Sequence, residues 1–197
     1  MEALDTGDLL LFNSQKRHIW DSFIYWGTHS NYSHTGIVLK NPTFIHPSLR
    51  GTYVWHSSWT GIPDPQDDRL KLGVQITPID QLLDSYRGGG HCFYRKLHCK
   101  NNFKKETLQQ IHEIVYDKPY DIYPKDWIDA FFKKDANPQK TDRFWCSALI
   151  GYIYTRCGIL QGDTDWSILS PGDFSLAGEN LRFCEGMSLS DTETRLF

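Results

Sequence analysis

The sequence predicts an α+β domain in which helices pack against one antiparallel β-sheet. Short apolar or alternating runs, typical of strands, fill mainly the first half of the 197-residue chain. Apolar residues at helical spacing fill mainly the second half. No linker divides the two halves, so we expect a single domain over residues 1–187, followed by a polar C-terminal tail over 188–197 that frays.

Strands are expected wherever apolar residues form a short run or alternate. Residues 9–12 are an uninterrupted apolar run of the kind that fills a buried strand. Residues 52–58 alternate instead, which places Val54 and His56 together on one face of the sheet. The remaining strands are expected at 32–39, 74–76 and 91–97, with an edge strand at 182–184.

Helix starts are predicted from capping residues. Thr77 is expected to cap a helix that has Pro78 at its first position. Asn101 or Asn102 is expected to cap a helix that ends near Pro119. Further helices are expected at 18–28, at 123–131 and at 143–157.

Composition excludes several classes of protein. The net charge is −3 and the pI is about 6.2, so the chain lacks the basic field that nucleic-acid binding requires. The N-terminal residues lack the features of a signal peptide, and no apolar run approaches the roughly 20 residues of a membrane span. The five cysteines are irregularly spaced, which predicts free thiols in a reducing, intracellular compartment. Peripheral contact with a membrane stays compatible with this composition.

The helix at 143–157 carries the first candidate for chemistry, Cys146. Asp142 precedes this helix as a potential cap, and Gly158 follows it where a left-handed residue ends a helix at low cost. Cys146 therefore falls in the first turn, where the helix dipole favours a thiolate and lowers the thiol pKa. The alternative is that Cys146 is a small apolar residue of the core.

Two histidines can complete a nucleophilic site around Cys146. His34 begins an apolar strand, where it is held stiffly, and His56 lies in the next strand. If these strands pair, the His56 ring can accept an N–H bond from His34 and orient it. A cysteine hydrolase needs such a thiol, an imidazole and a group that fixes the imidazole. The alternative for both histidines is a structural role in the core or at its edge.

A metal site has weaker support. The pairs His91 with Cys92 and His98 with Cys99 look like zinc ligands. Adjacent residues of a strand point to opposite faces, however, so neither pair chelates one ion well. The Cys-x-x-Cys spacing of structural zinc sites is also missing. We therefore expect no metal.

Carboxylate and cofactor chemistry also find little support. Asp64, Asp67 and Asp68 crowd one loop and are expected to form a solvated face. The chain has no phosphate-binding loop, no dinucleotide fingerprint and no Gly-x-Ser-x-Gly elbow. We therefore expect no cofactor.

Five short motifs occur in an order that resembles the circularly permuted NlpC-like cysteine peptidase superfamily. The resemblance is to its YiiX-like branch and, more distantly, to lecithin retinol acyltransferase. In the YiiX-like branch a glutamate is often expected at the third site position, and in the acyltransferase branch a histidine. The motifs lie at 7–12, 32–38, His56, 145–149 and 170–174.

The resemblance implies a papain-like core in permuted order, because His34 precedes Cys146. It implies that Cys146 is the nucleophile and His34 the base, with His56 at the third position. The expected function is a thiol hydrolase that cleaves an amide or ester of a peptide, amide or lipid-acyl substrate through an acyl-enzyme. A lipid acyl hydrolase or acyltransferase, a non-catalytic binding module and a virion component are the alternatives. Some tryptophans are expected to line an apolar groove and others to pack in the core: Trp20, Trp26, Trp55 and Trp59.

Overall fold

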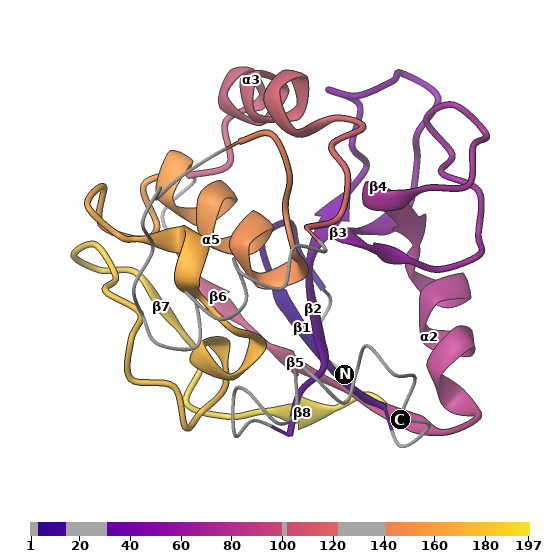
Figure 1. Ribbon diagram of the computed structural model, residues 1–197. Helices are drawn as coiled ribbons and strands as arrows, with labels where there is room; N and C mark the ends of the chain where they lie inside the picture. Colours follow the sequence, from indigo (N-terminus) through magenta and orange to yellow (C-terminus); the bar gives the residue numbers. More distant parts are fainter. Residues whose placement is uncertain (1–3, 15–30, 100–101, 122–140) are drawn as a thin grey trace.

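The computed structural model describes residues 4–14, 31–99, 102–121 and 141–197 (Figure 1). The described chain is an α+β fold built on an antiparallel sheet, as predicted. The order of strands in this sheet is β4-β3-β2-β1-β5-β8. The strands are β1 (Leu9–Ser14), β2 (His34–Lys40), β3 (Thr52–Trp59), β4 (Leu72–Pro78), β5 (Gly90–Arg95) and β8 (Thr194–Arg195).

Shorter elements surround the main sheet. A second, two-stranded sheet pairs β6 (Leu97–His98) with β7 (Ser188–Leu189). The α-helices of the described residues are α2 (Ile79–Arg87), α3 (Lys105–Val115) and α5 (Cys146–Arg156). Two 3₁₀ turns, η1 (Trp166–Ile168) and η2 (Pro171–Phe174), follow α5.

Both faces of the main sheet are buried, which explains the uninterrupted apolar run in β1. Leu9 and Leu11 belong to the larger core cluster, which contains residues of α3 and α5. Leu10 and Phe12 belong to a smaller cluster, which contains residues of α2. Successive side chains of a strand point to opposite faces. The sheet is therefore a middle layer, with α5 on one side and α2 on the other (Figure 1).

The first nine residues of α5, from Cys146 to Tyr154, are all buried. A helix that is apolar on every side is stable only inside a protein. One side of α5 packs against β2 and β3 and another contacts η1. The end of this helix that carries Cys146 is thereby fixed against the sheet.

The expected cap at Thr77 is wrong, because Thr77 belongs to a strand. β4 extends through this residue, and α2 begins at Ile79 without a side-chain cap. The expected cap at Asp142 is also wrong, since α5 has no side-chain cap and the Asp142 carboxylate lies 3.1 Å from the Arg143 guanidinium. At Thr77, the local capping signal was overridden by a tertiary contact with His56.

The end of α5 is as predicted at Gly158, whose φ of +68° is left-handed. Asn102 serves this end rather than the start of α3, which begins at Lys105 without a side-chain cap. Its amide donates to the carbonyl oxygens of Cys157 (3.1 Å) and Gly158 (3.4 Å). Asn101 and the helices expected at 18–28 and 123–131 lie outside the described residues.

The expectation that residues 188–197 fray is wrong. This segment contributes β7 to the small sheet and β8 to the edge of the main sheet. The buried guanidinium of Arg95 donates to the carbonyl oxygens of Ser190 (2.6 and 3.0 Å) and Phe174 (2.8 Å). Backbone pairing therefore holds a segment whose polar side chains gave no strand pattern.

Candidate active site

Strands β2 and β3 bring His34 and His56 together. Their paired register ends at Ile37↔Trp55, and its continuation sets Gly36 opposite His56. The two imidazoles then connect the strands, since Nε2 of His34 lies 3.1 Å from Nδ1 of His56. The rings meet edge to face with centroids 5.1 Å apart. The predicted pairing of these two histidines is thus present.

The close approach of these strands depends on Gly36. A Cβ on this residue would lie 2.6 Å from Cγ1 of Val54 and 3.2 Å from Cβ of His56. Changing Gly36 to alanine is therefore expected to push the strands apart and to cost about 1–3 kcal/mol of unfolding free energy. Urea unfolding measures this cost. Gly162, where a Cβ would meet nothing within 4 Å, supplies the control. Equal stability of Gly36→Ala and Gly162→Ala would contradict the prediction.

His56 is embedded in a chain of hydrogen bonds that the sequence did not reveal. Its Nε2 lies 2.9 Å from Oγ1 of Thr77, and its Nδ1 lies 3.0 Å from Oγ of Ser58 as well as facing His34. His56 is fully buried and His34 is 6% exposed. Burial lowers the pKa of His34 to about 4, and burial together with the charge of His34 lowers the pKa of His56. Both imidazoles are therefore neutral at pH 7, each with one donor and one acceptor nitrogen.

Cys146 lies in the first turn of α5, as predicted, and is its first residue, but its thiol pKa moves in the opposite direction to the one expected. The residue is only 2% exposed. Burial raises the pKa of the thiol to about 11, although hydrogen bonds from the backbone N–H groups of Thr35, Ser147 and Cys146 itself lower it. The helix terminus does stabilise negative charge here, but the loss of water outweighs it. The resting residue is a thiol, not a thiolate.

Hydrogen bonds hold the first turn of α5 from two sides. Ser57 of β3 donates its hydroxyl to the carbonyl oxygen of Phe144 (2.7 Å). On the other side, Ser147 (2.6 Å) and the Trp145 indole (3.1 Å) donate to the carbonyl oxygen of Leu169. Sequence patterns did not single out Ser57 or Ser147. Ser147 lies within the motif at 145–149, but the role of its hydroxyl, like that of Ser57, depends on contacts between distant segments.

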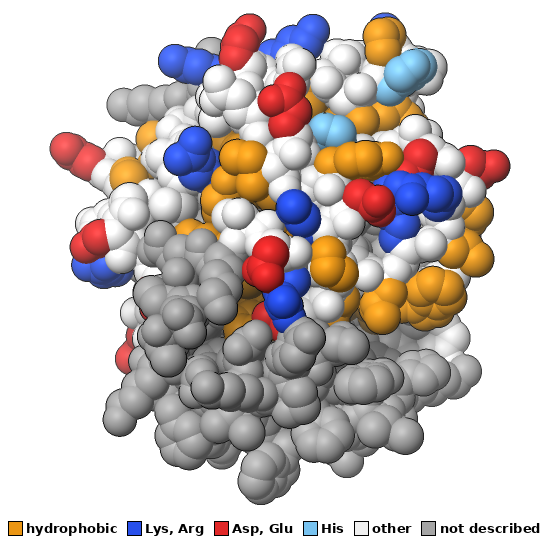
Figure 2. All heavy atoms as spheres, turned by 45° about the horizontal axis from the view of Figure 1, so that its top comes forward, with side chains coloured by type: hydrophobic (Ala, Val, Ile, Leu, Met, Phe, Trp, Pro, Cys, Tyr) orange, Lys and Arg blue, Asp and Glu red, His pale blue; other side chains and the backbone are white. Residues whose placement is uncertain are grey.

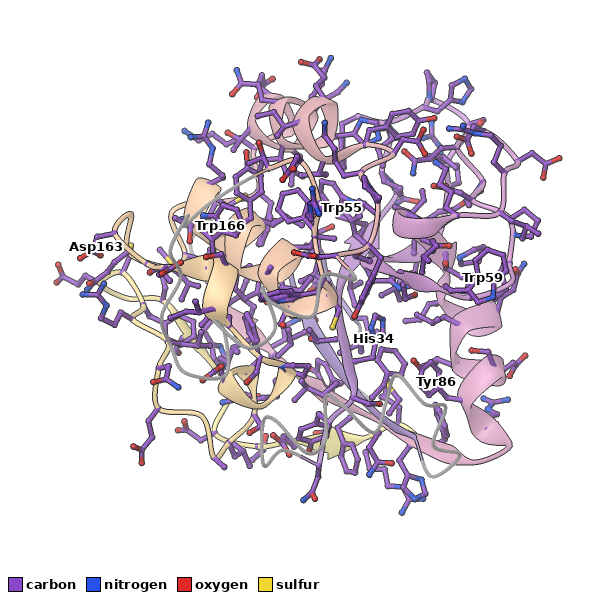
Figure 3. All side chains as sticks on the ribbon, viewed as in Figure 1. His34, Trp55, Trp59, Tyr86, Asp163 and Trp166 are labelled. Atoms are coloured by element: carbon purple, nitrogen blue, oxygen red, sulfur yellow. The ribbon has the colours of Figure 1, made fainter. Side chains whose placement is uncertain are left out.

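The three predicted site residues converge on the start of β2. The backbone N–H of Thr35, the neighbour of His34, lies near enough to the Cys146 thiol to lower its pKa. In Figure 3, His34 lies between the first turn of α5 and Tyr86 of α2. No side-chain hydrogen bond within the described residues joins Cys146 to His34. The hydrogen bond between His34 and His56 uses Nε2 of His34. Within the described residues, Nδ1 of His34 has no hydrogen-bond partner.

The acidic loop is not the solvated face that its composition predicted. Asp64 is fully buried, and its carboxylate lies 2.9 Å from Nζ of the buried Lys71. The same ammonium lies 2.9 Å from Asp67, which accepts a hydrogen bond from Tyr116 of the segment after α3 (2.7 Å). Ion pairs thus hold the loop together, and the hydrogen bond from Tyr116 connects it to the rest of the domain. On the face of the molecule drawn in Figure 2, acidic and basic side chains of the described residues lie next to one another.

Of the four tryptophans considered, the described residues include one in the core and one at the surface. Trp55 is 1% exposed and belongs to the core, so it lines no open groove. Trp59, at the end of β3, is 59% exposed and lies opposite the exposed Leu72 of β4. Trp20 and Trp26 lie outside the described residues.

Comparison with known proteins supports one aspect of the resemblance. No protein-family model matches the sequence, and no curated protein is significantly similar to it. Among solved structures, the crystal structure of YiiX from Escherichia coli O157:H7, described as a metalloprotein, matches with a TM-score of 0.53. The match covers 97% of this chain and 98% of YiiX at 17% identity. This chain has a YiiX-like fold.

At 17% identity, the similarity to YiiX concerns the fold alone. Of the pairs considered as zinc ligands, His91 and Cys92 lie in different surroundings: His91 accepts a hydrogen bond from Arg195 (2.8 Å), whereas Cys92 is buried in the sheet. Across the described ranges, no three His, Cys, Asp or Glu side chains are grouped so that they could hold one metal ion. The helices of those same ranges include none long and apolar enough to span a bilayer.

Proposed function

We propose that this protein is a thiol hydrolase with a permuted papain-like site, in which Cys146 forms an acyl-enzyme from an amide or ester. The observation that carries the proposal is the contact between Nε2 of His34 and Nδ1 of His56 at 3.1 Å. A buried imidazole fixed at Nε2 has its Nδ1 left for a proton from the neighbouring helix start. A general base needs a third group that fixes its ring, and His56 is placed to be that group for His34.

In the proposed first step, the Sγ of Cys146 bonds to the carbonyl carbon while the thiol proton passes to Nδ1 of His34. The carbonyl π electrons move to oxygen, where the N–H of Cys146 at the helix start is one donor to the oxyanion. When the carbonyl re-forms, the bond to the leaving group breaks and Nδ1 of His34 gives that group its proton. The product of this step is a thioester on Cys146.

In the second step, water attacks the thioester while Nδ1 of His34 takes a water proton. The C–S bond then breaks, the acid leaves, and the proton returns to the sulfur of Cys146. If another nucleophile replaces water, the same acyl-enzyme makes the protein an acyltransferase. Hydrolase and transferase therefore share every residue of this site, and only the acceptor differs.

The pKa values favour general-base catalysis over a preformed ion pair. With the thiol pKa raised to about 11 and the imidazole pKa lowered to about 4, both groups are neutral at pH 7. Proton transfer must then accompany the attack of sulfur, as it does for a serine nucleophile. His56 fits this scheme, because a neutral imidazole orients His34 without stabilising an imidazolium as a carboxylate does.

The loss of activity at acid pH follows from the same pKa values. Only neutral His34 can accept the thiol proton, so activity is present above its pKa and lost as pH falls through it. We expect the acylation rate to stay constant from pH 7 down to about pH 5 and to fall around pH 4. Stopped-flow release of nitrophenolate from p-nitrophenyl acetate, followed at its isosbestic wavelength, measures this. A midpoint near the ordinary histidine value of about 6.5 contradicts a buried base.

A metal-dependent reaction is the other possibility that the comparison raises, because YiiX is described as a metalloprotein. The site residues here do not fit a metal centre as arranged. Nε2 of His34 and Nδ1 of His56 face each other rather than a common point. We therefore derive no step through a metal ion.

Turnover of p-nitrophenyl acetate by the wild type and by Cys146→Ala tests the proposed function. We expect continuing release of nitrophenolate in the wild type and only the background rate in the variant. Cys157, buried at the other end of α5 with a pKa raised to about 12, provides the matched control. Cys157→Ala is expected to keep wild-type turnover. If Cys146→Ala also keeps it, the proposed function is wrong.

A further inference from the structure

We infer that Thr77 is a positioning residue that allows His56 to hold its proton on Nε2, and so holds His34 in the form that can deprotonate Cys146. This inference rests on the proposed function. It starts from a contact outside the three site residues: the Thr77 hydroxyl lies 2.9 Å from Nε2 of His56, and both residues are fully buried. Neither residue is exposed to bulk solvent.

The contact between the two imidazoles does not by itself select a tautomer. A neutral imidazole has one N–H, so either His34 donates from Nε2 or His56 donates from Nδ1. In the first arrangement Nδ1 of His34 is a free base. In the second arrangement the proton of His34 sits on Nδ1, and the ring cannot accept one from Cys146. Only the first arrangement supports the reaction.

The productive arrangement places the proton of His56 on Nε2, because its Nδ1 must accept from His34. A buried N–H without an acceptor is costly. Thr77 supplies that acceptor, and its threonine hydroxyl is able to accept. Ser58 cannot substitute for it, because its hydroxyl faces Nδ1 of His56 at 3.0 Å.

The fold places Thr77 at this point for a clear reason. In the register of β3 with β4, Val54 lies opposite Thr77 and His56 lies opposite Gln75. Thr77 is therefore a diagonal neighbour of His56 on the same face, within reach of a side-chain contact. A residue that resembles a helix cap by sequence thus lies in a strand, beside His56.

Thr77→Val tests the inference, because valine keeps the shape and the β-branch while removing the hydroxyl. Nitrogen-15 NMR of the histidine rings reads the tautomers directly. We expect both His34 and His56 to be Nε2–H in the wild type and both to shift toward Nδ1–H in Thr77→Val. The rate of Cys146 acylation by p-nitrophenyl acetate is expected to fall roughly 5- to 150-fold, the effect of one unsatisfied buried donor. Thr77→Ser, which keeps the hydroxyl, is expected to retain both properties.

Unchanged tautomers in Thr77→Val overturn the inference, and so does a rate in Thr77→Ser as low as that in Thr77→Val. A tautomer shift without a change in rate also overturns it, since Thr77 would then be structural only. If the wild type shows no acylation of Cys146, the proposed function fails. The NMR spectra still report whether Thr77 sets the tautomer, so the two failures are distinguishable.

Discussion

Replacing His34 by alanine is expected to slow acylation of Cys146 by about 10²–10⁴-fold, the usual contribution of a positioned general base. The effect is large because burial raises the thiol pKa to about 11, so almost no thiolate exists at pH 7 without a base. The single-turnover rate with p-nitrophenyl acetate at pH 7 measures it. His46→Ala is the matched control, because His46 is exposed in a loop and bonds to Ser48 (2.7 Å).

Stability must be measured beside the rate, since His34 is buried and its removal leaves Nδ1 of His56 without that contact. A His34→Ala protein that unfolds at nearly the urea concentration of the wild type, but acylates far more slowly, supports a catalytic role. A folded variant with the wild-type rate shows that the Cys146 thiol reacts without an imidazole. The account of the site is then wrong.

Changing Lys71 to methionine is expected to lower the unfolding free energy by about 3–5 kcal/mol, because it leaves a buried carboxylate without its partner. Asp64 is fully buried and the Lys71 side chain is 6% exposed, so little solvent screens their contact at 2.9 Å. Urea unfolding measures the change. Arg69→Met is the matched control, since Arg69 makes ion pairs with Asp67 and Asp117 while 55% of its side chain is exposed. That loss is expected to be about 0–1 kcal/mol.

A second variant distinguishes loss of the Asp64–Lys71 ion pair from general disruption of the loop. The double variant Asp64→Leu with Lys71→Met also removes the buried carboxylate that Lys71→Met leaves without an ion-pair partner. Much of the lost stability is therefore expected to return. If the double variant is as unstable as the two single variants combined, the residues act independently. If Lys71→Met costs no more than Arg69→Met, the buried pair has no special role.

Much of the fold could be predicted because its signals are local. The apolar run in β1 and the alternation in β3 indicated strands, and Gly158 indicated the end of α5. Cys146 at the start of that helix, and the pairing of His34 with His56, followed from element order and strand faces. Each of these predictions depends only on residues close in sequence or on one strand pairing.

The errors share a physical cause, which is that burial is a tertiary property. Thr77 resembles a helix cap by sequence, but its hydroxyl contacts a histidine from another strand. Asp64 resembles a solvated acid, but Lys71 folds back over it. The direction of the Cys146 pKa was predicted from the helix terminus alone, whereas desolvation has the larger effect. None of these contacts leaves a periodic pattern in the sequence.

The measurement that tests the central claim most directly is the location of the acyl group among the five cysteines. The protein is mixed with p-nitrophenyl acetate at pH 7, quenched in acid within the first turnover, digested and mapped by mass spectrometry. The account predicts acetyl on Cys146, which is buried, and its loss in His34→Ala. Exposure alone predicts the opposite order, because Cys99 and Cys184 are only partly buried. Acetyl groups on Cys99 and Cys184 with none on Cys146 would contradict the account.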